Sequence, residues 1–272
     1  MSHQASYGVT ARVGWLEWLP WAAALAVFFS LPEFMPFGAR ILVYILFALS
    51  LDLILGYAGI ITLGHTAFFG LGAYVAGILG AKLGVTDPLL QMAAAAAAAA
   101  ALGVATGAVI LRTKGLTLLM LTLAITTIMF EIANKATGLT GGADGLSGIV
   151  VSPIIGLFRF DMYGKTAYLY CLLALFIGWW ITRRIVYSPF GASLAGIRVN
   201  ITRAHAIGSP AYARLVAVYT ISATMAGCAG ALLTQTNQFV GLNVLSFEFA
   251  GELLVMLVLG GVGRIYGAFA GP

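Results

Sequence analysis

The sequence predicts an all-α, polytopic membrane bundle of about eight spans, in a single transmembrane domain over residues 1–272. Two observations carry this prediction. The 272 residues are 61% hydrophobic and only 8% charged, whereas a soluble domain carries roughly 25% charged residues. The apolar runs are also long enough to cross the hydrocarbon core of a bilayer, which takes about 20 residues. The bilayer is therefore expected to be the main solvent of this chain.

The candidate spans follow one another along almost the whole chain. They are residues 15–32, 39–57, 59–81, 89–111, 115–133, 166–182, 211–236 and 247–263. The first segment lacks a charged leader followed by a small-residue cleavage site, so we expect it to be retained as a span.

Basic residues predict the orientation. With a cytoplasmic N-terminus, the cytoplasmic positions hold Arg12, Arg112, Lys114, Arg183, Arg184, Arg198, Arg203, Arg214 and Arg264. The outer positions then hold Arg40, Lys82, Lys135, Arg159 and Lys165. Cytoplasmic loops carry an excess of Lys and Arg, so this distribution favours a cytoplasmic N-terminus. It also explains the net charge of +5 better than nucleic-acid binding does.

Small residues predict close helix packing. Residues 93–101 are nine consecutive alanines, and Gly103 and Gly107 follow with four-residue spacing, as do Gly80 and Gly84. Small side chains at this spacing let the backbones of neighbouring membrane helices approach closely.

Asp52 and His65 form the most informative polar pair. Asp52 lies about five residues before the expected turn at Tyr57-Ala58, and His65 about seven after it. At 1.5 Å per residue, both would lie roughly 8–10 Å deep on the arms of a helical hairpin and could face each other. An unpaired carboxylate in the membrane costs at least about 2.5–3.5 kcal/mol. The pair is therefore either a structural staple of the hairpin or part of a substrate pathway.

The hairpin itself is rich in glycine, with five glycines in the 17 residues from Gly56 to Gly72. Each glycine weakens a helix by roughly 1 kcal/mol relative to alanine. Unwound backbone at membrane depth survives only where it is buried in protein or lines a cavity. We therefore expect this segment, with Thr62 and Thr66, to border the conduit.

A glycine-rich loop follows the span 115–133. Its composition suits an outer docking or gating surface, and it equally suits an ordinary linker. Glu131, just before the loop, is either solvated at the interface or part of the pathway. The candidates in this region are Glu131 and Asn134 for the pathway, and Thr140, Gly141, Gly142 and Asp144 for the outer gate or docking loop.

Residues 188–210 predict a cytoplasmic amphipathic helix of about four turns. Pro189 can start a helix, and Gly208-Ser209-Pro210 can stop one. Such a helix either lies on anionic lipid or is a lever that a partner protein grips.

Five collinear motifs cover about residues 40–272. They are residues 56–74 (GYAGIITLGHTAFFGLGAY), 114–124 (KGLTLLMLTLA), 139–148 (LTGGADGLSG), 188–191 (SPFG) and 260–272 (GGVGRIYGAFAGP). Together they resemble the permease subunits of branched-chain amino acid ABC importers. The resemblance implies a bacterial inner-membrane heterodimer of two related permeases, two cytoplasmic ATPase subunits that bind ATP and Mg, and a periplasmic substrate-binding protein. It implies no cofactor or metal in this chain.

The resemblance also implies that residues 188–210 hold the coupling helix that docks on the ATPase, with Gly208 as its characteristic glycine. Family members carry acidic residues after the position of Arg198, whereas residues 199–202 are neutral here. A fixed salt bridge to the ATPase is therefore not expected at that position. Family members also continue beyond residue 272 into another span, so the chain would be a fragment or a shortened paralogue.

The leading prediction is a non-catalytic importer subunit for branched-chain or other hydrophobic amino acids; urea, short amides and aromatic acids stay open as substrates within the same family.

A phosphate-binding loop is excluded, because Gly164-Lys165-Thr166 is preceded by Arg159 where the pattern needs glycine. The rival class is an ion-coupled secondary transporter or a channel, which would need intramembrane carboxylates. Asp52 lies well inside a predicted span, while Glu248 and Glu252 flank the last one. A membrane enzyme would need clustered polar side chains, but the three histidines are spread along the chain.

Overall fold

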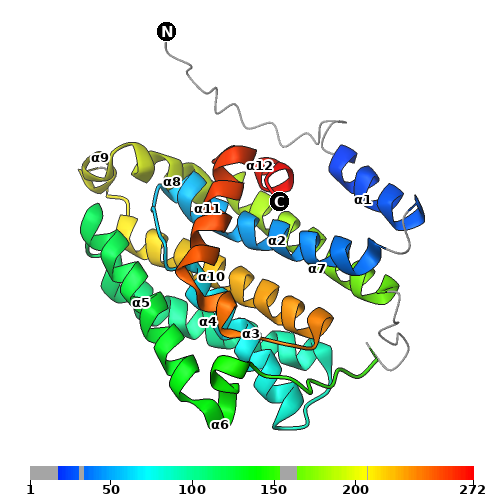
Figure 1. Ribbon diagram of the computed structural model, residues 1–272. Coiled ribbons are helices and arrows are strands. Elements are labelled where there is room, and N and C mark those ends of the chain that lie inside the picture. Colours follow the sequence, from blue (N-terminus) through cyan, green and yellow to red (C-terminus); the bar gives the residue numbers. More distant parts are fainter. Residues whose placement is uncertain (1–17, 31–33, 154–163, 207) are drawn as a thin grey trace.

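The computed structural model describes residues 18–30, 34–153, 164–206 and 208–272, and these form a helical bundle (Figure 1). The helices in chain order are α1 Leu19–Ser30, α2 Met35–Asp52, η3 Leu53–Ala58, α3 His65–Ala81, α4 Pro88–Ile110, α5 Leu116–Lys135, α6 Thr137–Thr140, η4 Gly142–Asp144, α7 Lys165–Val186, α8 Pro189–Val199, α9 Ile201–Ala206, α10 Ala211–Asn237, η5 Leu242–Leu245, α11 Phe247–Gly260 and α12 Gly267–Ala270. Within the described residues, extended pairing is confined to one isolated bridge between Leu146 and Val240. The predicted all-α class is confirmed.

Five helical stretches of the described residues are long and apolar enough to cross a membrane. They are Met35–Ala58, Pro88–Ile110, Leu116–Lys135, Lys165–Val186 and Ala211–Asn237. The expected count of eight spans is not confirmed. The helix predicted over 59–81 begins only at His65, and the one predicted over 247–263 is the 14-residue α11. At 1.5 Å per residue, α11 is about 21 Å long, which is shorter than a hydrocarbon core of about 30 Å.

Small residues hold α10 against α3 and α4 near the centre of the bundle. A Cβ atom added to Gly230 would collide with the backbone carbonyl of Phe69, and one added to Gly72 would collide with that of Gly227. The methyl group of Ala99, which is fully buried, occupies the space beside Gly227. Where two helix backbones approach this closely, only the hydrogen side chain of glycine fits at the contact points.

The glycines that follow the alanine run also confirm the predicted packing. A Cβ on Gly103 would lie 2.9 Å from the Ala223 methyl group, and one on Gly107 would lie 3.0 Å from the Tyr219 ring. Gly84 has a different role, because its φ of +65° forms a turn and no atom lies within 4 Å of its Cβ position.

Basic residues collect at one end of the bundle, which we call the basic end. It holds α8, α9, the α4–α5 turn and the segment after α11, whereas α6 lies at the opposite end (Figure 1). The basic side chains on these elements are Arg112, Lys114, Arg198, Arg203 and Arg264, and the adjoining helix ends add Arg183 and Arg184 in the last turn of α7 and Arg214 near the start of α10. Of the other residues of the orientation prediction, Arg12 and Arg159 lie outside the described residues. Arg40 lies on α2, Lys82 directly after α3, Lys135 at the end of α5 and Lys165 at the start of α7.

The α3–α10 contact makes a direct prediction. Gly72→Ala places a methyl group against the Gly227 backbone, and such overpacking costs about 1–3 kcal/mol. We expect a lower thermal unfolding temperature for the variant purified in detergent. Gly251→Ala is the matched control, because its Cβ meets no atom within 4 Å and alanine favours a helix by about 1 kcal/mol over glycine. Equal unfolding temperatures for the two variants would contradict the packing described above.

Candidate functional site

The chain between α2 and α3 is unwound. α2 continues as the π-helix Leu53–Ala58, Gly59 adopts a left-handed φ of 72°, and residues 60–64 run without helix to His65. This stretch packs against α5, where the Leu63 N–H lies 3.4 Å from Thr122 Oγ1. A Cβ on Gly64 would collide with the Thr122 carbonyl. The expected loss of helix in the glycine-rich segment is confirmed, and α5 covers part of the unwound backbone, at Leu63 and Gly64.

His65 begins α3 in the middle of the bundle, with only 2% of its surface exposed. Its Nε2 atom lies 2.8 Å from Ser50 Oγ on α2 and 3.5 Å from Ser222 Oγ on α10. The ring stacks on Phe47, with ring centres 5.6 Å apart. Ser222 Oγ also donates a hydrogen bond to the carbonyl oxygen of Ser50. His65 therefore ties three helices together at the point where α3 starts.

Asp52 faces a different neighbour. Its Oδ1 atom accepts a hydrogen bond of 2.7 Å from the backbone N–H of Gly263, just beyond α11. Within the described residues no hydrogen bond or ion pair joins Asp52 to His65, so the predicted pair is wrong. The prediction assumed a helical hairpin. Residues 59–64 are not helical, so the helical rise assumed for that arm does not apply, and His65 contacts Ser50 instead of Asp52.

The guanidinium of Arg198, on α8, closes the junction beside Asp52. Arg198 Nη1 donates a hydrogen bond to the carbonyl oxygen of Gly56 in the π-helix. The aliphatic part of the same side chain covers Gly59, since a Cβ there would lie 2.7 Å from Arg198 Cγ. A Cβ on Gly56 would collide with the Asp52 carboxylate and the Gly263 backbone. We call Asp52, Gly56, Gly59, Arg198 and Gly263 the glycine junction.

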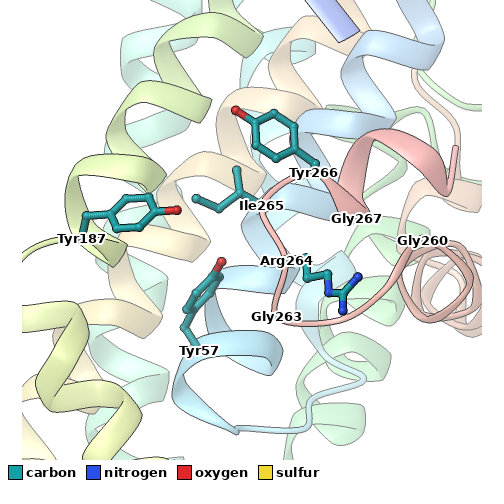
Figure 2. A pocket seen from close by; sticks show the side chains of 8 residues that line it. All are labelled: Tyr57, Tyr187, Gly260, Gly263, Arg264, Ile265, Tyr266 and Gly267. Carbon is teal, nitrogen blue, oxygen red and sulfur yellow. The ribbon is translucent and has the colours of Figure 1, made fainter. Parts of the chain in front are cut away.

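Two cavities flank the glycine junction. The first, of about 520 Å³, is lined by Tyr57, Tyr187, Gly260, Gly263, Arg264, Ile265, Tyr266 and Gly267. Figure 2 shows the Tyr187 and Tyr57 rings on the side of this cavity across from the Gly263–Gly267 turn. The second, of about 490 Å³, lies between residues 58–61, the α4–α5 turn and Arg198. The contact between α8 and the π-helix is therefore bordered by open space on both sides.

The prediction of a single four-turn helix within residues 188–210 is wrong, because residues 189–206 form two helices. Asn200 has an extended backbone, with φ −158° and ψ 102°, between α8 and α9. Its Oδ1 accepts a hydrogen bond of 3.0 Å from the Arg203 N–H at the start of α9. Asparagine at a helix start competes with continued helix in this way. The predicted start at Pro189 is confirmed, with Ser188 Oγ accepting a hydrogen bond from Gly191 N–H.

The two short helices have a buried face and an exposed face. Gly191 is buried, and a Cβ there would collide with the Val186 carbonyl. Arg203 and His205 are exposed on α9, and Gly208 has a left-handed φ of 78° with open space around it. The exposed face of α9 is thus available to another protein or to lipid.

The remaining predicted residues do not join the glycine junction. Thr62 and Thr66 are buried near the start of α3, with Thr62 Oγ1 accepting a hydrogen bond from Gly64 N–H. The other predicted residues lie near α6, at the opposite end from α8 (Figure 1). There the Thr140 hydroxyl donates to backbone carbonyls, Gly141 has φ +77° and Gly142 is buried, whereas Glu131 and Asp144 are exposed and Asn134 is partly buried.

Residues 34–272 match the family described as branched-chain amino acid transport system, permease component. The match covers both the unwound α2–α3 connection and the α8–α9 segment. This chain belongs to that family. No enzyme family is indicated, and membership together with the apolar helices makes this permease chain a membrane protein.

Two curated relatives of the permease chain carry the same name. The high-affinity branched-chain amino acid transport system permease protein LivM of Escherichia coli (strain K12) is 28% identical over 248 residues, and so is LivM of Salmonella typhimurium (strain LT2). Each alignment covers 82% of this chain and 57% of the relative, so the chain spans little more than half of their length. No solved structure matches the chain.

The sequence analysis did not find the hydrogen-bond partners of Asp52 and His65. It treated the run 260–272 only as a family motif, although Gly263 donates to Asp52. It also missed Ser50 and Ser222, the partners of His65. A serine two residues before Asp52 on an apolar helix was the available signal, because a hydroxyl in a membrane helix needs a partner.

The different partners of Asp52 and His65 predict how their substitutions combine. His65→Ala and Asp52→Asn should destabilise the purified chain additively, within about 0.5 kcal/mol, because they share no contact. His65→Ala and Ser50→Ala remove the two ends of one hydrogen bond and should be non-additive. Thermal unfolding of the single and double variants measures both pairs. Strong coupling between residues 52 and 65 would contradict the arrangement described here.

Proposed function

We propose that this chain is a pore-forming permease subunit of an ATP-driven importer for branched-chain or other hydrophobic amino acids. It would span the inner membrane of a bacterium with its N-terminus and the basic end in the cytoplasm. The eight basic side chains of that end support this orientation, since cytoplasmic segments carry the excess of Lys and Arg. The names of the relatives support the substrate class.

The proposed partners are a second permease subunit, two cytoplasmic ATPase subunits and a periplasmic substrate-binding protein. ATP and Mg would be bound by the ATPase subunits, and the permease would change its access from one side to the other. In this scheme the exposed faces of α8 and α9 dock on an ATPase. The outer loop around Thr140 and Asp144 would face the binding protein.

The observation that carries the proposal is the hydrogen bond from Arg198 to the Gly56 carbonyl. It connects the helix that would dock on an ATPase directly to the broken end of a membrane helix. A π-helix leaves its last carbonyl groups without intrahelical partners, and Arg198 supplies a donor to one of them. Movement of α8 would therefore displace α2 and, through Asp52 and Gly263, the end of α11.

Substitution of Arg198 by alanine tests this mechanism. A charge-assisted hydrogen bond contributes about 1.5–3 kcal/mol, so Arg198→Ala should loosen α8 from the π-helix. In proteoliposomes containing the partner subunits, we expect leucine uptake per ATP hydrolysed to fall about tenfold, since 1.4 kcal/mol corresponds to a factor of ten. Leu173→Ala, on the exposed apolar face of α7, is the control. Unchanged uptake per ATP hydrolysed in the Arg198→Ala variant would contradict the proposed coupling from α8 to the π-helix.

Arg203 and His205 test the docking surface separately. Both side chains are exposed on α9, so replacing both with alanine should leave membrane insertion intact. We expect the double variant to recover much less ATPase subunit on co-purification. Leu83→Ala, an exposed position beyond the end of α3 and away from α9, serves as the control. Full recovery of the ATPase by the double variant would remove the assignment of α9 as the docking surface.

A further inference from the structure

α11 begins at mid-depth in the bundle. The ring of Phe249, in its first turn, lies 5.7 Å from the Phe47 ring on α2 and 5.5 Å from the Phe69 ring on α3. About 12 residues, or roughly 18 Å of helix, separate Phe47 from the start of α2 and Phe69 from the end of α3. The hydrocarbon core is about 30 Å thick, so the first turn of α11 lies near its middle.

Two carboxylates stand on the exposed face of α11 at this depth. Glu248 is next to Phe249, and Glu252 is one helical turn further on; both are exposed. The same face continues through Val255 and Leu259, which are also exposed. These two glutamates were expected to flank a span, but the position of Phe249 places them inside the bundle's apolar layer.

The segment that leads into α11 is non-helical for much of its length and also lies within that layer. Between α10 and α11 only residues 242–245 form a short 3₁₀ turn. Leu245 reaches α3, because a Cβ on Gly70 would collide with its side chain. Phe239 and Asn243 of this segment are exposed. Irregular backbone is not found against lipid, because its polar groups have no partners there.

The outward face of α7 shows what a lipid-facing surface of this chain looks like. Its exposed side chains Leu169, Leu173, Ile177 and Trp180 are all apolar and follow helical spacing. On α11 the corresponding positions hold Glu248 and Glu252. An ionised carboxylate is disfavoured in hydrocarbon, so the α11 face and the α7 face have different surroundings.

We propose that the α11 face, formed by Glu248, Glu252, Val255 and Leu259 together with residues 238–246, is covered by the second membrane-spanning subunit of the transporter. This inference rests on the proposed function. The partner surface must be helical and apolar along Val255 and Leu259, and must offer Lys, Arg, His or hydroxyl donors opposite the two carboxylates. Hydrogen-bonded pairing of this kind satisfies polar groups within membranes.

Nitroxide accessibility in the assembled transporter tests the proposal. Val255→Cys is spin-labelled in a chain whose two native cysteines are replaced by alanine, and it leaves both glutamates in place. Leu173→Cys on the apolar face of α7 is the matched control. Relaxation by oxygen reports lipid contact, and relaxation by a water-soluble nickel chelate reports water. We expect the label at 255 to show low values for both probes, with oxygen access about threefold or more below that at 173, as in a packed interface.

Two results would overturn the inference. Oxygen access at 255 equal to that at 173 would mean that lipid covers the face, and strong relaxation by the nickel chelate would mean that only water does. ATPase co-purification and ATP-driven leucine uptake are measured on the same samples. Loss of both in the unlabelled transporter would contradict the proposed function instead, whereas a lipid-exposed label in an active transporter contradicts only the assignment of this face.

Discussion

Every backbone polar group in an apolar layer needs a partner, and that constraint shapes this molecule around one break. Where α2 stops being an α-helix, the π-helix and residues 59–64 leave carbonyl and amide groups outside the regular helical pattern. The Gly56 carbonyl is satisfied from outside the membrane helices, by the Arg198 side chain of α8. A surface helix therefore supplies one of the hydrogen-bond donors that the break needs.

The same break connects parts of the chain that are far apart in sequence. Asp52 holds the segment after α11 through the Gly263 amide, and Gly56 leaves room for both groups to approach. On the other side of the unwound stretch, His65 joins α3 to Ser50 and Ser222. One end of the stretch is thus tied to a surface helix and the other to the centre of the bundle. In the proposed importer, this arrangement would let a movement of the ATPase subunits reach the centre of the bundle.

Much of this architecture could be predicted from the sequence, and the failures have physical causes. Composition and apolar length gave the helical membrane bundle, and the alanine run with Gly103 and Gly107 gave its tight packing. The prediction of an Asp52–His65 pair failed because the apolar pattern does not show that the helix stops at Ala58 and begins again only at His65. The single coupling helix failed at Asn200, whose side chain caps a new helix. Contacts such as Arg198 with Gly56 span 142 residues and depend on tertiary geometry, which local patterns do not encode.

The central claim is that α8 and the broken end of α2 move as one body. Double electron–electron resonance between nitroxides at Val199 and Ile61, both exposed, measures this directly in the assembled transporter. The account predicts the same distance distribution with and without bound ATP, while the distance from Val199 to Leu116, across the second cavity, shifts. A 199–61 distance that changes as much as the 199–116 distance would contradict it.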